Sequence, residues 1–344
     1  MRKLLNTLYV QQPDYYLSLE QEAVVISKDR VTVAKFPLLN FESIVTSSQV
    51  SVSPSLLAAC MEREISITYL DRNGKFLARV SGQNIGNVLL RKNQFRYSDD
   101  KTVSCQIARN MILGKSYNQR WLLDRYCRDH PLSIDLDSIQ KCCCNLQASY
   151  TRIKECADLD ILRGMEGELA QQYFAVFDSL ILKNHDFFAF KKRTRRPPLD
   201  PVNSVVSYLY TILYHESASA LSCVGLDPYV GFLHRDRSGR MSLALDLMEE
   251  LRAPLVDRMT LTLINRGQLK AQHFEKQAAG AVLITNEGRK TIIEAWQRRK
   301  QEIIMHPFLK EKIEWGTVLY TQALLLARFL RGDLDAYPPF LYKN

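Results

Sequence analysis

Short apolar runs separated by charged links characterise the first 80 residues of this chain. The runs cover residues 15–19, 23–27, 31–36 and 41–45 and are rich in β-branched and aromatic side chains. Runs of this length and composition predict β strands. Residues 1–10 add a further apolar run that leads into Gln11-Gln12-Pro13 without a small-residue cleavage site. We therefore interpret it as a strand and not as a signal peptide.

One helix is predicted among these strands. Ser53 is a suitable capping residue and Pro54 suits the first helical position, before the apolar stretch at 56–61. The next two runs, 65–70 and 75–80, flank Asn73-Gly74, a pair that is typical of a tight hairpin turn. Many short strands in so short a segment predict a small sandwich or a split pair of sheets.

From about residue 85 the apolar spacing becomes helical. Ile107, Met111 and Leu122 lie on one long patterned stretch. Further helices are predicted at 161–182, 201–219, 242–265, 285–303 and 314–331, the fourth of them capped by Thr285. We expect an α+β protein with a link near 80–88. Residues 1–84 would form a β-rich, sandwich-like N-terminal domain, and residues 85–344 a larger, mostly α-helical domain.

The composition is that of a basic globular protein. The chain has 344 residues, 46% of them hydrophobic, and a net charge of +9. A positive excess favours a polyanionic partner such as nucleic acid. No apolar run approaches the ~18 residues that span a bilayer, so we expect no membrane segment. The eight cysteines show neither disulfide-framework nor zinc spacing, which favours reduced cysteines in the cytoplasm.

Four separated side chains are candidate metal ligands or catalytic groups: Glu166, His234, Asp246 and Glu249. Glu166 is expected near the start of its helix, between Gly164 and Gly167, which would let a ligand or another backbone approach. The alternative is an ordinary helix-start glutamate favoured by the macrodipole.

His234 follows the β-like run 229–233 and precedes a polar loop, so it is expected at a strand end, where ligation or proton transfer is feasible. A lone histidine is more often structural.

Asp246 and Glu249 are spaced i, i+3, so both carboxylates would project from one side of a helix, with Glu250 one step round. A solvated acidic face is the ordinary alternative. However, leucines and a methionine crowd this helix, and a bound cation would offset the cost of burying carboxylates there. Carboxylates with one imidazole suit Mg²⁺ or Mn²⁺ better than zinc.

A basic segment lies between Glu166 and His234 in the sequence. Its cations are Lys191, Lys192, Arg193, Arg195 and Arg196, followed by two prolines that favour extended chain. It is either a charged, solvated linker or a segment that contacts DNA phosphates. Arg237, Arg240, Arg252 and Arg258 flank the acidic helix and are further candidates for phosphate binding. Phosphate-loop, zinc-protease, dinucleotide and serine-esterase motifs are absent from the sequence.

Four motifs resemble the CRISPR-associated integrases of spacer acquisition, the Cas1 family. They occupy residues 163–167, 198–203, 231–234 and 242–250, in the order of the family, and the ending at 337–340 agrees. The pattern is closest to the type I-C variety. Glu166, His234 and Glu249 match the metal ligands of the family, and Asp246 matches its further acid. Glu249 stands where many relatives carry aspartate, which is also a hard oxygen ligand.

This resemblance implies a metal-dependent integrase of CRISPR adaptation. In the implied transesterification, the 3′-hydroxyl ends of prespacer DNA attack phosphodiesters at the repeat boundaries of a CRISPR array, and the N-terminal domain dimerises. The implied assembly is a heterohexamer in which two homodimers flank a dimer of a small ferredoxin-like Cas partner. Two alternatives stay open at this point: a stand-alone metal-dependent endonuclease in repair, and a non-catalytic basic DNA-binding scaffold.

Overall fold

The computed structural model describes residues 6–10, 14–47, 49–70, 76–80, 82 and 88–343. Within it the chain forms two compact units. One comprises residues 1–85 with 293–304 and 313–318, and the other comprises residues 86–292 with 305–312 and 319–344. The predicted turn at Asn73-Gly74 and most of the predicted link at 80–88 lie outside the described residues.

The smaller unit is built on two four-stranded sheets. Their strands are β1 (Asn6–Val10), β2 (Tyr15–Glu20), β3 (Ala23–Lys28), β4 (Val31–Pro37), β5 (Phe41–Ser47), β6 (Ser51–Val52), β7 (Ser66–Leu70) and β8 (Phe76–Val80), with a 3₁₀ turn, η1, at Leu38–Asn40. The strand orders are β1-β5-β7-β8 and β4-β3-β2-β6. Strands β1, β5 and β7 are parallel, whereas β2, β3 and β4 are antiparallel. The strands predicted from alternating apolar runs are therefore present.

Helix α1 (Pro54–Glu62) covers part of these sheets. Its start is as predicted, because the Ser53 hydroxyl accepts a hydrogen bond from the Leu56 amide at 3.2 Å. Leu56 is fully buried, together with Leu17, Ile44 and Ile67 from the strands. The apolar faces of both sheets and of α1 thus share one core, which is what a split pair of sheets needs for stability.

The larger unit is mainly helical. Its elements are α2 (Val88–Asp99), α3 (Lys101–Asp129), α4 (Leu136–Glu155), α5 (Leu159–Ala175), η2 (Phe177–Leu180), α6 (His185–Phe188), α7 (Pro201–Cys223), α8 (Ser242–Met248), η3 (Glu249–Leu251), η4 (Arg252–Asp257), α9 (Arg258–Asn265), η5 (Ala271–His273), β9 (Phe274–Lys276) and β10 (Val282–Ile284). Elements α10 (Asn286–Gln301), β11 (Ile303–Met305), β12 (Lys312–Glu314) and α11 (Trp315–Arg331) are divided between the two units. The predicted α+β class is confirmed.

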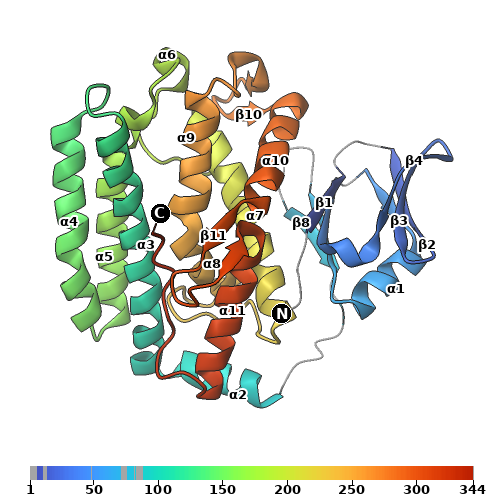
Figure 1. Cartoon of the computed structure of the whole chain (residues 1–344), viewed down its shortest axis with the longest axis horizontal. Helices are drawn as coiled ribbons and strands as arrows, with labels where there is room; N and C mark the ends of the chain where they lie inside the picture. Colours follow the sequence, from blue (N-terminus) through green and yellow to red (C-terminus); the bar gives the residue numbers. More distant parts are fainter. Residues whose placement is uncertain are drawn as a thin grey trace. The chain divides into compact units, whose positions relative to one another are not determined.

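Helices α3, α4 and α5 lie side by side in the larger unit (Figure 1). Helix α3 is the central element because it also packs against η3 and η4. Its buried residues include Ile107, Met111 and Leu122, which share the predicted stripe. Among the described residues, we find no helix that combines the length and the apolar character needed to cross a bilayer.

Two predicted helices are interrupted. The helix predicted at 161–182 ends at Ala175 and is followed by the 3₁₀ turn η2. In that turn the Asp178 carboxylate accepts the Phe190 amide at 2.6 Å and lies 2.7 Å from the His185 ring.

The helix predicted at 242–265 is broken into α8, the 3₁₀ turn η3, the π-helical turn η4 and α9. Pro254 lies in this region and has no N–H to donate to the Glu250 carbonyl. The side-chain amide of Asn118 donates to that carbonyl instead, at 2.7 Å. A π turn that interrupts a helix is common at functional sites, and this one begins three residues after Glu249.

Candidate active site

Asp246, in α8, is completely buried and holds the loop that carries His234. Its Oδ2 accepts the amide N–H groups of Phe232 and Leu233 at 2.6 and 2.9 Å. Its Oδ1 accepts the His234 amide at 3.0 Å and lies 2.6 Å from His234 Nδ1. A carboxylate at this distance keeps the proton on Nδ1, so the lone pair of His234 Nε2 is free for ligation.

The loop is not the strand that the sequence predicts. Residues 229–233 form no strand and take an irregular path. Besides Asp246 of α8, helix α2 also fixes this path, because Gln94 and Ser98 donate to the Val230 and Gly231 carbonyls at 2.9 and 2.7 Å. Gly231 is required, because a Cβ there would lie 2.9 Å from Asp246 Oδ2 and 2.8 Å from the Ser242 Cβ. The absence of a side chain at 231 therefore lets three consecutive amides converge on one carboxylate.

Glu249 begins the 3₁₀ turn that ends α8, and its side chain is 3% exposed. Its Oε1 lies 2.8 Å from Arg252 Nη2 and 4.0 Å from His234 Nε2. Burial acts to raise the pKa of Glu249, but the charges of Arg252 and Lys115 outweigh it and hold the pKa well below its usual value. Glu249 is thus ionised at neutral pH.

Glu166 meets Glu249 through a third residue, Lys115 of α3. The Lys115 ammonium pairs with Glu166 Oε1 and lies 2.8 Å from Glu249 Oε2. Glu166 is the eighth residue of α5, two turns from the helix start, so the macrodipole does not account for it. The structure thus brings Glu166 and Glu249 together on one ammonium. His234 Nε2 lies 4.0 Å from Glu249 Oε1, and Asp246 holds His234 from the other side of its ring.

Comparison with known proteins shows the family of the chain. A family model described as CRISPR associated protein Cas1 matches residues 8–298. The chain belongs to the Cas1 family. A relative from Rhodospirillum rubrum, named CRISPR-associated endonuclease Cas1 2, is 49% identical over 350 residues and covers all of both chains.

Two solved structures share the fold of this Cas1. One is a casposase bound to integration product, with a TM-score of 0.83 and 21% identity, over 98% of this chain and 95% of that chain. The other is a Cas6-RT-Cas1–Cas2 complex, with a TM-score of 0.80 and 23% identity, over 99% of this chain and 36% of the matched chain.

Lys115 was not anticipated from the sequence of this Cas1. Its side chain is only 8% exposed, and the neighbouring positions on α3, Met111, Ile112, Asn118 and Gln119, are all buried. A charged residue in such a stripe is rare unless it is paired. Lys115 could have been recognised on this basis, because a lysine at a core position of a long helix predicts a buried carboxylate partner.

Within the described ranges, no three acidic, histidine or cysteine side chains lie close enough to hold a metal as they stand. The Lys115 ammonium lies between the two glutamates. The donor set nevertheless fits a divalent cation. Glu249 Oε2 is buried and pairs with Lys115 Nζ at 2.8 Å, a position that a metal cation could take over. Two carboxylates and one imidazole nitrogen are ligands that Mn²⁺ and Mg²⁺ accept.

Two arginines predicted to bind DNA are turned inward in this Cas1. Arg252 pairs with Glu249 and its guanidinium lies 4.6 Å from the centre of the Tyr210 ring. Arg193 lies 5.5 Å from the same ring and donates to Asn203 Oδ1 at 2.7 Å and to Ser207 Oγ at 3.0 Å. The predicted phosphate-binding role does not fit this placement, since both groups are engaged within the protein.

The Tyr210 ring is in turn held by a buried carboxyl. Asp257 accepts hydrogen bonds from the hydroxyls of Tyr210 and Tyr173, at 2.7 and 3.0 Å. Burial raises the pKa of Asp257 to about 6, although both hydroxyls and the two arginines act against it. Asp257, Tyr210 and Arg252 therefore form a chain of contacts that ends on Glu249.

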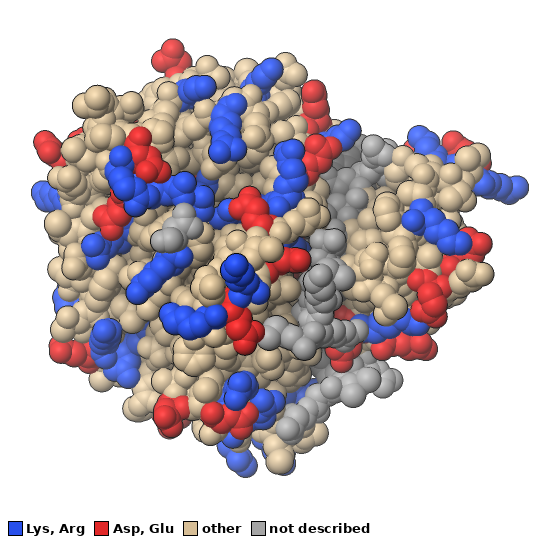
Figure 2. Space-filling model, viewed as in Figure 1, with Lys and Arg blue, Asp and Glu red and all other residues tan. Residues whose placement is uncertain are grey.

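The other basic candidates are more accessible. Lys191, Lys192, Arg195, Arg196 and Arg237 are exposed. Arg240 is half-buried beside Ser242, and Arg258 is half-buried with its guanidinium 5.4 Å from the centre of the Trp121 ring. Lys and Arg side chains are spread across the face of the larger unit shown in Figure 2, with Asp and Glu among them. The exposed five are thus available to a polyanion.

Glu250 points away from this group. Its carboxyl accepts hydrogen bonds from the Tyr337 hydroxyl at 2.5 Å, from the Phe340 amide and from Gln322 Nε2 at 3.3 Å. Complete burial raises its pKa to about 8 despite these donors. Glu250 is therefore an anchor for the C-terminal segment and not the third acid of the site that its sequence position suggested.

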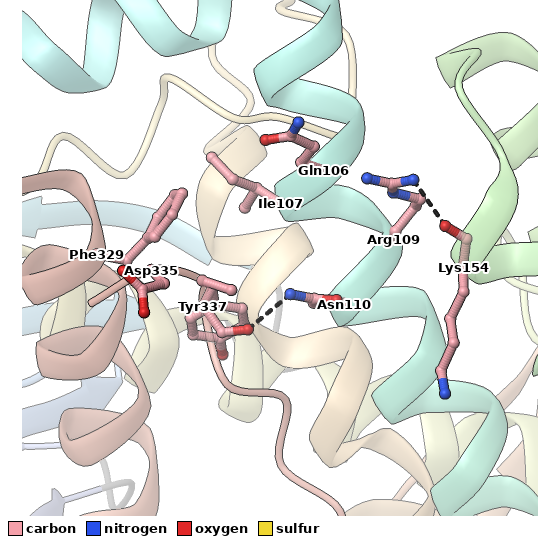
Figure 3. A pocket seen from close by; sticks show the side chains of 9 residues that line it. Gln106, Ile107, Arg109, Asn110, Lys154, Phe329, Asp335 and Tyr337 are labelled. Atoms are coloured by element: carbon pink, nitrogen blue, oxygen red, sulfur yellow. Dashed lines mark hydrogen bonds between the residues drawn. The ribbon is translucent and has the colours of Figure 1, made fainter. Parts of the chain in front are cut away.

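A separate cavity of about 290 Å³ lies between α3, α11 and the C-terminal segment. Figure 3 shows Asn110 donating to the Tyr337 carbonyl, at 2.8 Å, and Arg109 donating to the Lys154 carbonyl, at 2.7 Å, along its wall. None of its lining residues belongs to the cluster around Lys115. The cavity is therefore no part of the candidate active site.

Proposed function

We propose that this Cas1 is a metal-dependent DNA integrase and endonuclease of CRISPR adaptation. It joins the 3′-hydroxyl ends of prespacer DNA to the repeat boundaries of a CRISPR array by transesterification. The observation that carries this proposal is that Glu166 and Glu249 meet at Lys115, while His234, oriented by Asp246, lies 4.0 Å from Glu249. Such a set of hard donors beside a basic surface suits chemistry on phosphodiesters.

Glu166, Glu249 and His234 Nε2 would hold Mg²⁺ or Mn²⁺. When bound, the metal supplies charge that polarises a phosphoryl oxygen and favours the attacking and leaving oxygens. Glu249 is fixed for this purpose by Arg252, which rests against Tyr210. Asp246 keeps His234 in the tautomer whose Nε2 is unprotonated. One phosphodiester replaces another, so no nucleotide-binding loop is needed.

The exposed lysine and arginine side chains would bind the phosphates of the DNA. Lys191, Lys192, Arg195 and Arg196 lie on one segment between η2 and α7, and Arg237 follows His234 in its loop. A row of exposed charges binds phosphates without reading sequence. Gly164 and Gly167 are exposed on α5, and among the described residues a Cβ built at either would meet no atom within 4 Å beyond its chain neighbours and the helix backbone. This surface of α5 is open to a DNA backbone.

The protein would act in an assembly. We propose a homodimer formed through the β-rich unit and two such dimers on a dimer of a small ferredoxin-like Cas partner, a heterohexamer. The names of similar proteins support a nucleic-acid role: one is called an endonuclease, one is a casposase with integration product, and one is a complex that contains Cas1 and Cas2.

The test is integration of a labelled duplex with free 3′-hydroxyls into a plasmid that carries a CRISPR array, with Mn²⁺ or Mg²⁺ and the small partner. Wild type is compared with Glu166→Gln, His234→Ala and the surface control Glu168→Gln. Joined product that is lost with either site variant or with chelator, but kept by the control, is expected. Cleavage without joining would favour the stand-alone endonuclease, and joining that survives both site variants would refute this active site.

A further inference from the structure

Lys115 is the one feature of the cluster around Glu249 that the proposed chemistry does not use. It lies on the buried face of α3, in contact with both glutamates, and its side chain is 8% exposed. Breaking such a buried pair by removing one partner is costly, because an uncompensated charge remains. In the absence of metal, therefore, the ammonium is what keeps Glu166 and Glu249 close to each other.

The charges of the two glutamates, Glu166 and Glu249, are balanced without any metal. Lys115 and Arg252 supply two positive charges against the two carboxylates of Glu166 and Glu249. Asp246 and His234 satisfy each other and the loop amides. A divalent cation added to this balanced group would meet the repulsion of the Lys115 ammonium, which already contacts the same two carboxylates.

The two cations on Glu249 differ in how they are held. Arg252 is fixed from outside the cluster, because its guanidinium rests on the Tyr210 ring, and that ring is tied to Asp257. Lys115 is a point charge on a flexible four-carbon stem, held at its tip by the two carboxylates themselves. When a stronger cation arrives, Arg252 can stay in place while the Lys115 ammonium withdraws.

We propose that Lys115 is a built-in counter-ion that holds the two glutamate ligands together in the metal-free protein and yields its position to the metal. This inference rests on the metal ligands of the proposed function. It gives Lys115 a positioning role with a definite sign: the residue stabilises the metal-free fold and opposes metal binding. A lysine that only supported the ligands would have the opposite effect on metal affinity.

The experiment measures Mn²⁺ binding and thermal unfolding of the purified full chain, without DNA. Lys115→Met removes the charge and keeps the length and bulk of the side chain. Lys154→Met, which removes the same charge from an exposed site, is the control. Free Mn²⁺ is followed by electron paramagnetic resonance, and unfolding by circular dichroism in chelator and in saturating Mn²⁺. Lys115→Gln, which retains a hydrogen-bond donor, serves if the methionine variant does not fold in chelator.

Lys115→Met should melt below wild type in chelator and recover most of the difference in Mn²⁺. Its apparent Kd for Mn²⁺ should be lower, on the order of tenfold, because the metal no longer has to break two buried ion pairs. An unchanged or weaker Kd, with wild type still binding Mn²⁺, would overturn the counter-ion role alone. If no variant and not even wild type binds Mn²⁺, the metal centre of the proposed function fails together with this inference. If Mn²⁺ binds more tightly to the variant but integration fails in wild type, the inference stands and the proposed reaction does not.

Discussion

Asp246 Oδ1 lies 2.6 Å from His234 Nδ1, while Oδ2 of the same carboxylate accepts two backbone amides from the loop that carries the histidine. A single buried side chain thus sets both the path of the loop and the proton position on the ring. It makes Asp246 a positioning residue for His234, because its oxygens are engaged with the loop and have no free lone pair directed at the space between Glu166 and Glu249.

We predict that Asp246→Asn weakens metal binding without removing a ligand. An amide cannot accept from the amides on one side and the ring on the other, because one of its two ends is a donor. The Mn²⁺ affinity should fall about 10- to 100-fold, as for other groups that orient a ligating histidine. Asp236→Asn, an exposed acid in the same loop, is the matched control. An unchanged Kd for Mn²⁺ in Asp246→Asn would show that the histidine needs no orientation.

Alanine substitutions of Gly231 and Gly164 should have opposite effects on the free energy of unfolding. Gly231→Ala should lower the free energy of unfolding by about 1–3 kcal/mol, because its Cβ would enter the packed contact between Ser242 and Asp246. Gly164→Ala should raise it by about 0.5–1 kcal/mol, because Gly164 lies inside α5 with open space around it. Urea denaturation measures both; a stabilised Gly231→Ala would contradict the close approach.

The same open space predicts a separation of stability from DNA binding at Gly167. Gly167→Ala should raise the melting temperature, since among the described residues its Cβ would meet no atom within 4 Å beyond its chain neighbours and the helix backbone. If DNA passes over this exposed surface of α5, the added methyl group should also weaken duplex binding by several-fold, by analogy with the ~1–3 kcal/mol cost of overpacking. Fluorescence anisotropy with a labelled duplex measures this. A more stable variant that binds DNA like wild type would place the DNA elsewhere.

Two nearby arginines should differ although both are in the basic segment. Arg195→Ala, at an exposed position, should weaken DNA binding and reduce the slope of log K against log salt by about one unit, with stability within about 0.5 kcal/mol of wild type. Arg193→Ala should instead cost roughly 1–3 kcal/mol of stability, because Asn203 and Ser207 lose their donor. Anisotropy titrations at several salt concentrations and urea denaturation measure the two effects. Equal effects of the two substitutions on stability would contradict the structural role of Arg193 and the exposed, DNA-binding role of Arg195.

Acid should destabilise the helical unit through His306. This ring is fully buried, with Nε2 3.1 Å from Gln322 Oε1, and burial lowers its pKa to about 4. Between the ordinary value of 6.5 and about 4, the unfolded chain binds a proton that the folded protein does not. The contribution of His306 to the free energy of unfolding should therefore fall as the pH drops through this window, by at most about 3 kcal/mol.

Comparison of wild type with His306→Gln isolates this contribution. The variant should lose part of the pH slope between pH 6.5 and 4 in urea denaturation. His185→Gln, at an exposed histidine, should keep the slope of wild type. A variant with the slope unchanged would show that other groups account for the acid sensitivity.

The sequence allowed the prediction of most helices and strands and of the candidate site residues, but not of which partner each side chain contacts. The i, i+3 spacing of Asp246 and Glu249 predicts one shared direction, yet α8 ends at Met248 and the two carboxylates contact different partners. Pro254 was the local signal for that break, because it cannot donate to the Glu250 carbonyl. The inward direction of Arg193 and Arg252 depends on Tyr210, from another helix, and no local pattern contains that information.

Glu249 and Glu250 are adjacent in the chain and face opposite ways, and the second of them is bound to Phe340, ninety residues later. The residue next to the proposed ligand Glu249 is therefore held by Tyr337 and Phe340. A truncation before Tyr337 would leave every proposed ligand in the sequence and would still strip the donors from a buried carboxyl next to Glu249. We therefore expect removal of Tyr337 and Phe340 to disturb the proposed active site, although neither residue belongs to it.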